Sequence, residues 1–114
     1  EIFVPRIPSY RILDLAESIG PNCKKEFVGI RPGEKIHEEM ITTSDSYSTI
    51  QLDDYFAILP MDGELKQLYQ SRGIPFKSFP EGTSYNSEKN EDFLSIHQLR
   101  ELIKTNIDNN FSPV

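Results

Sequence analysis

Proline and glycine interrupt this chain so often that no long helix or strand can form. The 114 residues contain eight prolines and six glycines, which separate short apolar runs from one another. Proline lacks a backbone N–H and resists helix and sheet interiors, while glycine favours turns and helix ends. We therefore expect an α/β fold, a small mixed domain of short strands and three to four helices around one modest core.

The front of the chain predicts two strands and two helices. Residues 2–4 and 24–30 are rich in β-branched and aromatic side chains, which is typical of strands. Between them, apolar residues recur at i, i+3, i+4 and i+7, which predicts a helix that Ser9 caps and a Gly-Pro pair ends at residue 19. Residues 34–40 are expected to form a second, short helix.

The rest of the chain alternates in the same way. Residues 46–60 predict one or two strands, broken at two adjacent aspartates, and residues 64–73 predict a helix that ends at a glycine. Residues 74–92 hold two prolines and a Ser/Asn-rich stretch, so we expect a loop or arm there. Ser95 and Gln98 have the spacing of a capping box, which marks the start of the last helix.

The charge, the apolar runs and the cysteine content of the chain limit its possible partners and location. The net charge of −6 argues against a nucleic-acid or anionic-membrane surface, because both require basic patches. No apolar run approaches the roughly 18–20 residues of a membrane-spanning helix. A single cysteine, Cys23, cannot form an internal disulfide, which favours a cytoplasmic location. The first residue, Glu1, already lies in a strand pattern, so we expect a piece of a longer chain.

Few residues suggest chemistry by their spacing. His37 and His97 lack a second ligand at metal-binding distance in the sequence, and we expect no metal site. His37, beside two glutamates, is better explained by a surface ion pair. Tyr85 and Lys89 have the Tyr-x-x-x-Lys spacing of short-chain dehydrogenases, but no glycine-rich dinucleotide loop precedes them. We therefore predict no catalytic residue in this chain.

The segment Arg31-Pro32-Gly33-Glu34 is the exception. Arginine offers a planar fork of donors suited to phosphate oxygens, and Pro32 and Gly33 favour a tight turn. A carboxylate at Glu34 can accept hydrogen bonds from the two hydroxyls of a ribose. Taken alone, these four residues favour the simpler interpretation, a β-turn with a solvated ion pair.

The surrounding sequence changes this balance. Four stretches resemble, in the same order, the C-terminal part of one family: EIFVPRIPSYRILDLAESI, FVGIRPGEKIHEEMI, DDYFAILP and YNSEKNEDFLSIHQLRELI. That family is the inverting UDP-N-acetylglucosamine 4,6-dehydratases, extended short-chain dehydrogenase/reductases that act in making bacterial surface sugars such as pseudaminic acid. The resemblance covers nearly the whole chain and is least clear over residues 61–84.

The resemblance implies roles for individual residues. Arg31 matches an arginine that contacts the diphosphate of the UDP-sugar, and Glu34 matches an acid that holds the ribose hydroxyls. Pro32 and Gly33 match the turn that positions them. Arg6 and His37 match family-typical positions to which the resemblance assigns no role.

The resemblance also implies that substrate binding and catalysis belong to different domains. Residues 1–114 would be a single C-terminal substrate-binding domain, and a missing N-terminal Rossmann domain would bind NADP and carry the catalytic groups. We expect this chain alone to bind no cofactor and to be inactive; a homo-oligomer of the full enzyme remains open. Two alternatives stand beside this one: a stand-alone nucleotide-sugar binding or oligomerisation module, and a small acidic protein-interaction domain.

Overall fold

The computed structural model describes residues 1–114, which divide into two units that each pack internally. Unit 1 contains Glu1–Ile7 and His37–Lys89, and unit 2 contains Pro8–Ile36 and Asn90–Val114. Each unit therefore joins segments that are far apart in the sequence. That the whole chain acts as one domain stays a prediction.

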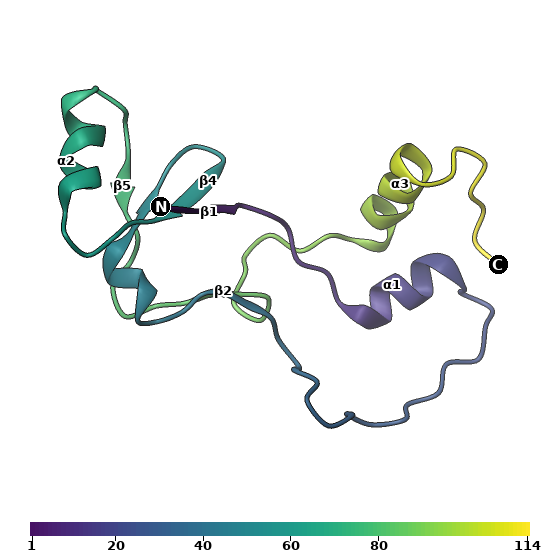
Figure 1. The fold of residues 1–114 in the computed structure, drawn as a ribbon. Coiled ribbons are helices and arrows are strands. Elements are labelled where there is room, and N and C mark those ends of the chain that lie inside the picture. Colours follow the sequence, from purple (N-terminus) through teal and green to yellow (C-terminus); the bar gives the residue numbers. More distant parts are fainter. The chain divides into compact units, whose positions relative to one another are not determined.

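A four-stranded antiparallel sheet lies at the centre of unit 1 (Figure 1). Its strands, in spatial order, are β1 (Ile2–Pro5), β4 (Tyr55–Ile58), β3 (Thr49–Gln51) and β5 (Lys77–Ser78). The strands predicted at residues 2–4 and within residues 46–60 are confirmed, including the break at the two aspartates. β5 falls within the predicted loop or arm, most of which has no regular structure.

Side chains alternate between the two sides of a strand, and each face of this sheet contributes side chains to a buried cluster. One core contains the buried side chains Val4, Ile41, Phe56 and Phe79. The other contains Ile50, Ala57, Leu59 and Tyr69, the last from helix α2 (Glu64–Ser71). The predicted helix over residues 64–73 is thus confirmed. The expectation of one core is wrong, because elements cover both faces of the sheet.

A second, smaller pairing also stabilises unit 1. β2 (Glu39–Ile41) pairs with β6 (Tyr85–Asn86) in antiparallel register, and a 3-10 turn, η1 (Asp45–Ser48), leads into β3. The helix predicted over residues 34–40 is therefore wrong. Its local helical propensity is overridden by backbone pairing with a segment about 45 residues further along the chain.

Two helices form unit 2. α1 (Ile12–Ile19) packs against α3 (Ile96–Asn106), in which Leu99 is buried. The predicted capping box of α3 is confirmed: the Gln98 N–H donates to Ser95 Oγ at 3.2 Å, and the Ser95 N–H donates to Gln98 Oε1 at 2.8 Å.

Ser9 does not cap α1, contrary to expectation, and Arg11 occupies the N-cap position instead. The backbone of Ser9 is held elsewhere, because its N–H donates to the Asp92 carbonyl and its carbonyl accepts from the Leu94 N–H, both at 2.8 Å. This bridge keeps Ser9 extended and moves the start of the helix to Ile12.

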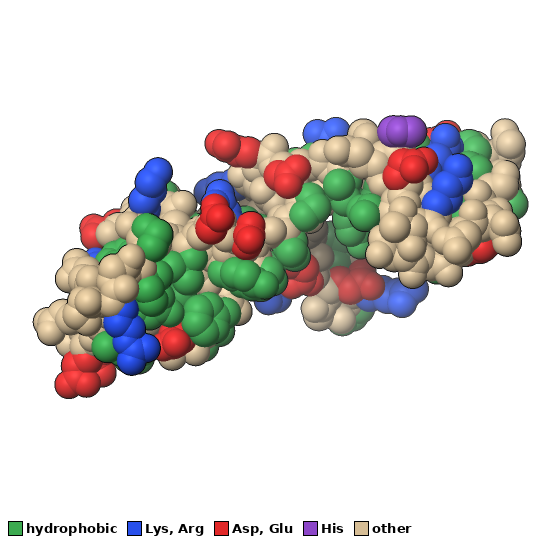
Figure 2. Space-filling model, turned by 90° about the horizontal axis from the view of Figure 1, so that it is seen from above, with side chains coloured by type: hydrophobic (Ala, Val, Ile, Leu, Met, Phe, Trp, Pro, Cys, Tyr) green, Lys and Arg blue, Asp and Glu red, His purple; other side chains and the backbone are tan.

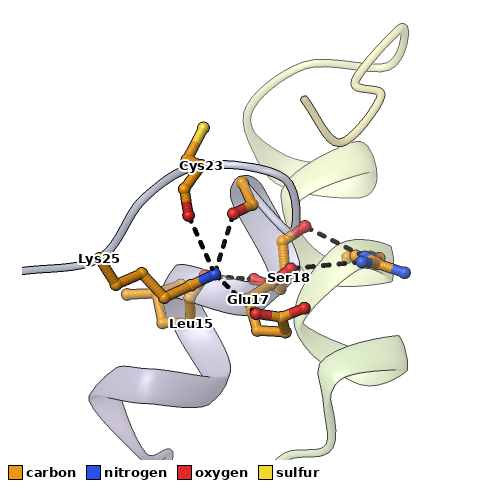
Figure 3. A network of polar contacts seen from close by, with 7 residues as sticks. Leu15, Glu17, Ser18, Cys23 and Lys25 are labelled. Carbon is orange, nitrogen blue, oxygen red and sulfur yellow. Dashed lines mark hydrogen bonds and ion pairs between the residues drawn. The ribbon is translucent and has the colours of Figure 1, made fainter.

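Two basic side chains donate hydrogen bonds to the carbonyls that lack a partner within the helix at the C-terminal end of α1 (Figure 3). Lys25 Nζ lies 2.7 Å from Glu17 Oε2 and donates to the Gly20 carbonyl at 3.2 Å. From α3, Arg100 Nε donates to the Ser18 carbonyl at 3.0 Å. Cations are favourable at this end of a helix because they oppose its dipole. The contacts of Lys25 thus tie the start of residues 24–36 to the C-terminal end of α1.

Candidate functional site

Residues 31–34, which are predicted to contact a nucleotide and which we call the nucleotide clamp, lie in an irregular and exposed segment. The strand predicted over residues 24–30 is wrong: these residues form no ladder, and Phe27 and Val28 are 81% and 78% exposed. A strand requires a partner for its backbone groups, and no neighbouring strand pairs with this segment. The apolar side chains therefore remain uncovered in this chain.

The four residues Arg31 to Glu34 form a tight turn. The Glu34 N–H donates to the Arg31 carbonyl at 3.1 Å, which is the closing hydrogen bond of a β-turn. Gly33 has a φ of +85°, which fits the third position of a type II turn with Pro32 at the second. The turn predicted from Pro32 and Gly33 is thus present.

The side chains of Arg31 and Glu34 converge on the same side of this turn. Glu34 Oε2 accepts from the Arg31 N–H at 2.8 Å, and Glu34 Oε1 lies 3.8 Å from Arg31 Nε. The two side chains are 78% and 50% exposed. The guanidinium makes no hydrogen bond within the chain, so its five donors are available to a ligand.

Arg6 and His37, the two further candidates, both belong to unit 1. Arg6 Nη1 donates to the Asp53 carbonyl at 3.2 Å, and its guanidinium lies over the Phe56 ring, 5.3 Å from the centroid. His37 Nε2 lies 4.0 Å from Glu88 Oε1. A surface ion pair was expected for His37, but the two neighbouring glutamates are not its partner. Only tertiary structure supplies Glu88, and no sequence signal points to it.

Tyr85, which has the Tyr-x-x-x-Lys spacing with Lys89, takes part in the packing of unit 1. The Tyr85 ring packs 4.9 Å from the Phe56 ring, and its hydroxyl is bonded to the backbone of Ile7. That this chain has no catalytic residue stays a prediction.

Comparison with known proteins identifies the family. The model of the family described as polysaccharide biosynthesis protein matches residues 1–60. The chain belongs to the polysaccharide biosynthesis protein family. This match includes β1, the clamp segment and both strands that flank the double aspartate.

The relatives of this chain include dehydratases and epimerases. The chain is 38% identical over 107 residues to an inverting UDP-N-acetylglucosamine 4,6-dehydratase of Campylobacter jejuni, covering 90% of this chain and 32% of the relative. It is 31% identical to a UDP-glucose 4-epimerase of Rickettsia canadensis, covering 92% of this chain and 31% of that protein. The dehydratase match lies in its C-terminal part, which confirms the family resemblance. The chain spans about a third of the length of these relatives.

A solved structure supports the fold. The X-ray structure of Pen from Bacillus thuringiensis matches this chain with a TM-score of 0.68 and 28% sequence identity. The match covers 90% of this chain and 30% of that one. The expected fold class, a small mixed α/β structure with short strands and three to four helices, is confirmed, and the chain has three α-helices.

On the face shown in Figure 2, acidic and basic side chains are interspersed, and apolar side chains reach the surface between them. No three His, Cys, Asp or Glu side chains gather where they could hold a metal ion. None of the helices is both long and apolar enough to cross a bilayer. The exposed turn at Arg31 and Glu34 is thus the best candidate for ligand contact.

Proposed function

We propose that this chain is the UDP-sugar-binding portion of an NADP-dependent, 5-inverting UDP-N-acetylglucosamine 4,6-dehydratase. The observation that carries the proposal is the turn at residues 31–34, which brings an unbonded guanidinium and a carboxylate together. The similarity to the dehydratase of Campylobacter jejuni supports it, because that relative bears this activity in its name.

Each residue of the turn has a distinct task. Arg31 binds the diphosphate, because a guanidinium can donate two parallel hydrogen bonds to phosphate oxygens. Glu34 accepts hydrogen bonds from the ribose hydroxyls, and Pro32 and Gly33 set the backbone that presents both side chains. An exposed ion pair stabilises a protein by only about 0.2–1 kcal/mol, so a ligand can readily replace the contact between Arg31 and Glu34.

We assign the steps of the dehydratase reaction to the part of the enzyme that lies outside this chain. Residues outside this chain would hold NADP, which would supply hydride transfer. The exposed apolar side chains of Phe27, Val28 and Ile36 fit this division, because they would be covered when a further domain completes the pocket. We expect the 114-residue chain alone to form no 4-keto product from UDP-N-acetylglucosamine and NADP.

Titration of the ¹⁵N-labelled chain with UMP and UDP tests the binding role. We expect saturable shifts of the backbone amides of residues 29–35, with a dissociation constant on the order of millimolar, equivalent to about 4 kcal/mol. UDP should bind more tightly than UMP because it adds a phosphoryl group for Arg31.

Two variants make this test specific. Arg31→Gln should abolish the difference between UDP and UMP, whereas Lys35→Gln removes the same charge from the same segment and should retain it. Equal weakening by both variants would show that only general electrostatic attraction is at work, and would contradict the proposed contact.

A further inference from the structure

Two cationic side chains, Arg6 and Lys77, lie on one face of the sheet in unit 1. The strand register aligns Val4 with Phe56, Phe56 with Gln51, and Gln51 with Lys77 in one row across all four strands. Arg6 follows Val4 by two residues, so it belongs to the same face. The fold therefore brings Arg6 and Lys77 from opposite edges of the sheet onto one surface.

Arg6 is held in place without being neutralised. Its Nη1 atom donates to the backbone carbonyl of Asp53, and the Phe56 ring lies beneath the guanidinium. No carboxylate oxygen forms an ion pair with it. Since one hydrogen bond uses one of five N–H donors, four donors remain for a ligand.

Lys77 and Gln51 complete the polar side of this surface. Lys77 is exposed and forms no ion pair within the chain. The Gln51 amide donates to the Ser78 carbonyl at 3.1 Å, which fixes its side chain beside Lys77. The ammonium of Lys77 therefore keeps its three donors for solvent or for a ligand.

These residues line an open groove of about 490 Å³. Its walls include Arg6, Lys77 and Gln51, together with the apolar Pro75 and Phe76. One acid, Asp53, also lines it, so two cations face one carboxylate in a chain whose net charge is −6. Another groove of unit 1 is smaller, about 230 Å³, and is lined by one lysine, Lys66, and one acid, Glu81.

We propose that the Arg6–Lys77 groove binds a phosphate-bearing small molecule. A phosphate or diphosphate group carries enough charge and enough oxygens to engage both cations, whereas a carboxylate offers one negative charge and two oxygens. Neighbouring strands are about 4.8 Å apart, so the two edge strands are separated by roughly 14 Å before their side chains extend inward. That span suits a diphosphate better than a single phosphate. The site uses none of the residues of the nucleotide clamp and goes beyond the proposed function.

Titration with sodium pyrophosphate at constant ionic strength tests this site in the ¹⁵N-labelled chain. We expect saturable shifts at the amides of Gln51 and Lys77 and at the side-chain Nε of Arg6. Lys77→Gln should raise the dissociation constant at least threefold, and Arg6→Gln about tenfold. Lys66→Gln removes the same charge beside the other groove and should leave the dissociation constant unchanged.

Arg6→Gln could disturb folding because Arg6 stacks on Phe56, so the exposed Lys77→Gln variant decides the outcome. Shifts that do not saturate, or equal weakening by Lys77→Gln and Lys66→Gln, would overturn the proposal. Shifts at residues 29–35 report the nucleotide clamp separately, so either site can fail while the other persists. A parallel titration with ribose 5-phosphate distinguishes two kinds of ligand. Tighter binding of ribose 5-phosphate than of pyrophosphate assigns the groove to a sugar phosphate, and weaker binding assigns it to a free diphosphate.

Discussion

The hydroxyl of Tyr85 bonds twice to the backbone of Ile7, 78 positions away in the sequence: it donates to the carbonyl at 2.9 Å and accepts from the N–H at 3.0 Å. This contact fastens the end of the first segment of unit 1 to the strand β6. It gives the tyrosine with dehydrogenase-like spacing a structural role.

Replacing Tyr85 by Phe should therefore affect stability. The ring would stay against Phe56, but the two hydrogen bonds between the hydroxyl and the backbone of Ile7 would be lost, which costs about 1–2 kcal/mol in the free energy of unfolding. Urea unfolding measures this change. Tyr47→Phe is the matched control, since Tyr47 is exposed and its hydroxyl makes no hydrogen bond in the chain; it should change stability by less than about 0.5 kcal/mol. Equal effects of the two variants would contradict the structural role.

Arg100 is expected to stabilise the helix pair of unit 2. Arg100→Met keeps much of the aliphatic stem but removes the donors to the carbonyls of Ser18 and Glu17, and hydrogen bonds from charged groups contribute about 1.5–3 kcal/mol each. Amide hydrogen exchange should become at least tenfold faster in α1. The control Lys104→Met removes a charge from the exposed last turn of α3 and should leave exchange in α1 unchanged.

Tyr69 should make stability depend on pH in the alkaline range. Burial, and secondly the charge of Glu1, raise the pKa of Tyr69 above its ordinary value of 10.0. The folded chain thus holds this proton more tightly than the unfolded chain. The resulting stabilisation is complete below pH 10 and is lost as pH rises through the folded-state pKa.

The comparison of wild type with Tyr69→Phe isolates this effect. The difference in their unfolding free energies, measured with urea at pH 8 and pH 11, should shift against the wild type at the higher pH. The same comparison for the exposed Tyr47→Phe should give the same difference at both pH values. No shift for Tyr69→Phe would show that the phenol is not desolvated in solution.

Gly33 should matter for ligand binding more than for stability. Its φ of +85° costs a side-chain-bearing residue about 1–2 kcal/mol, although no atom lies within 4 Å of the position a Cβ would occupy. Gly33→Ala should therefore weaken UDP binding about fivefold to thirtyfold, because the turn presents Arg31 and Glu34. Gly29→Ala, also at a positive φ and unobstructed, is the matched control outside the turn. Calorimetric binding should separate the two variants, and equal losses would contradict a specific role of the turn.

Local sequence signals predicted those elements whose stabilising contacts lie within a few residues. The capping box at Ser95 and Gln98, the helix α2 and the turn at Pro32 and Gly33 all satisfy their backbone groups locally. Ser9 shows the limit of such signals. It is a good capping residue, but bonds to Asp92 and Leu94 hold its backbone in an extended form.

The turn that places Glu34 against Arg31 follows from local sequence alone, because Pro32 fixes its own φ and Gly33 readily adopts the positive φ that the next position requires. Tertiary structure alone decided that residues 24–30 lack a strand partner and that residues 39–41 pair with β6 instead of forming a helix. It also decided the partner of His37 and the groove shared by Arg6 and Lys77. The physical reason is that strand pairing is a contact between distant segments, and its register cannot be read from either segment alone.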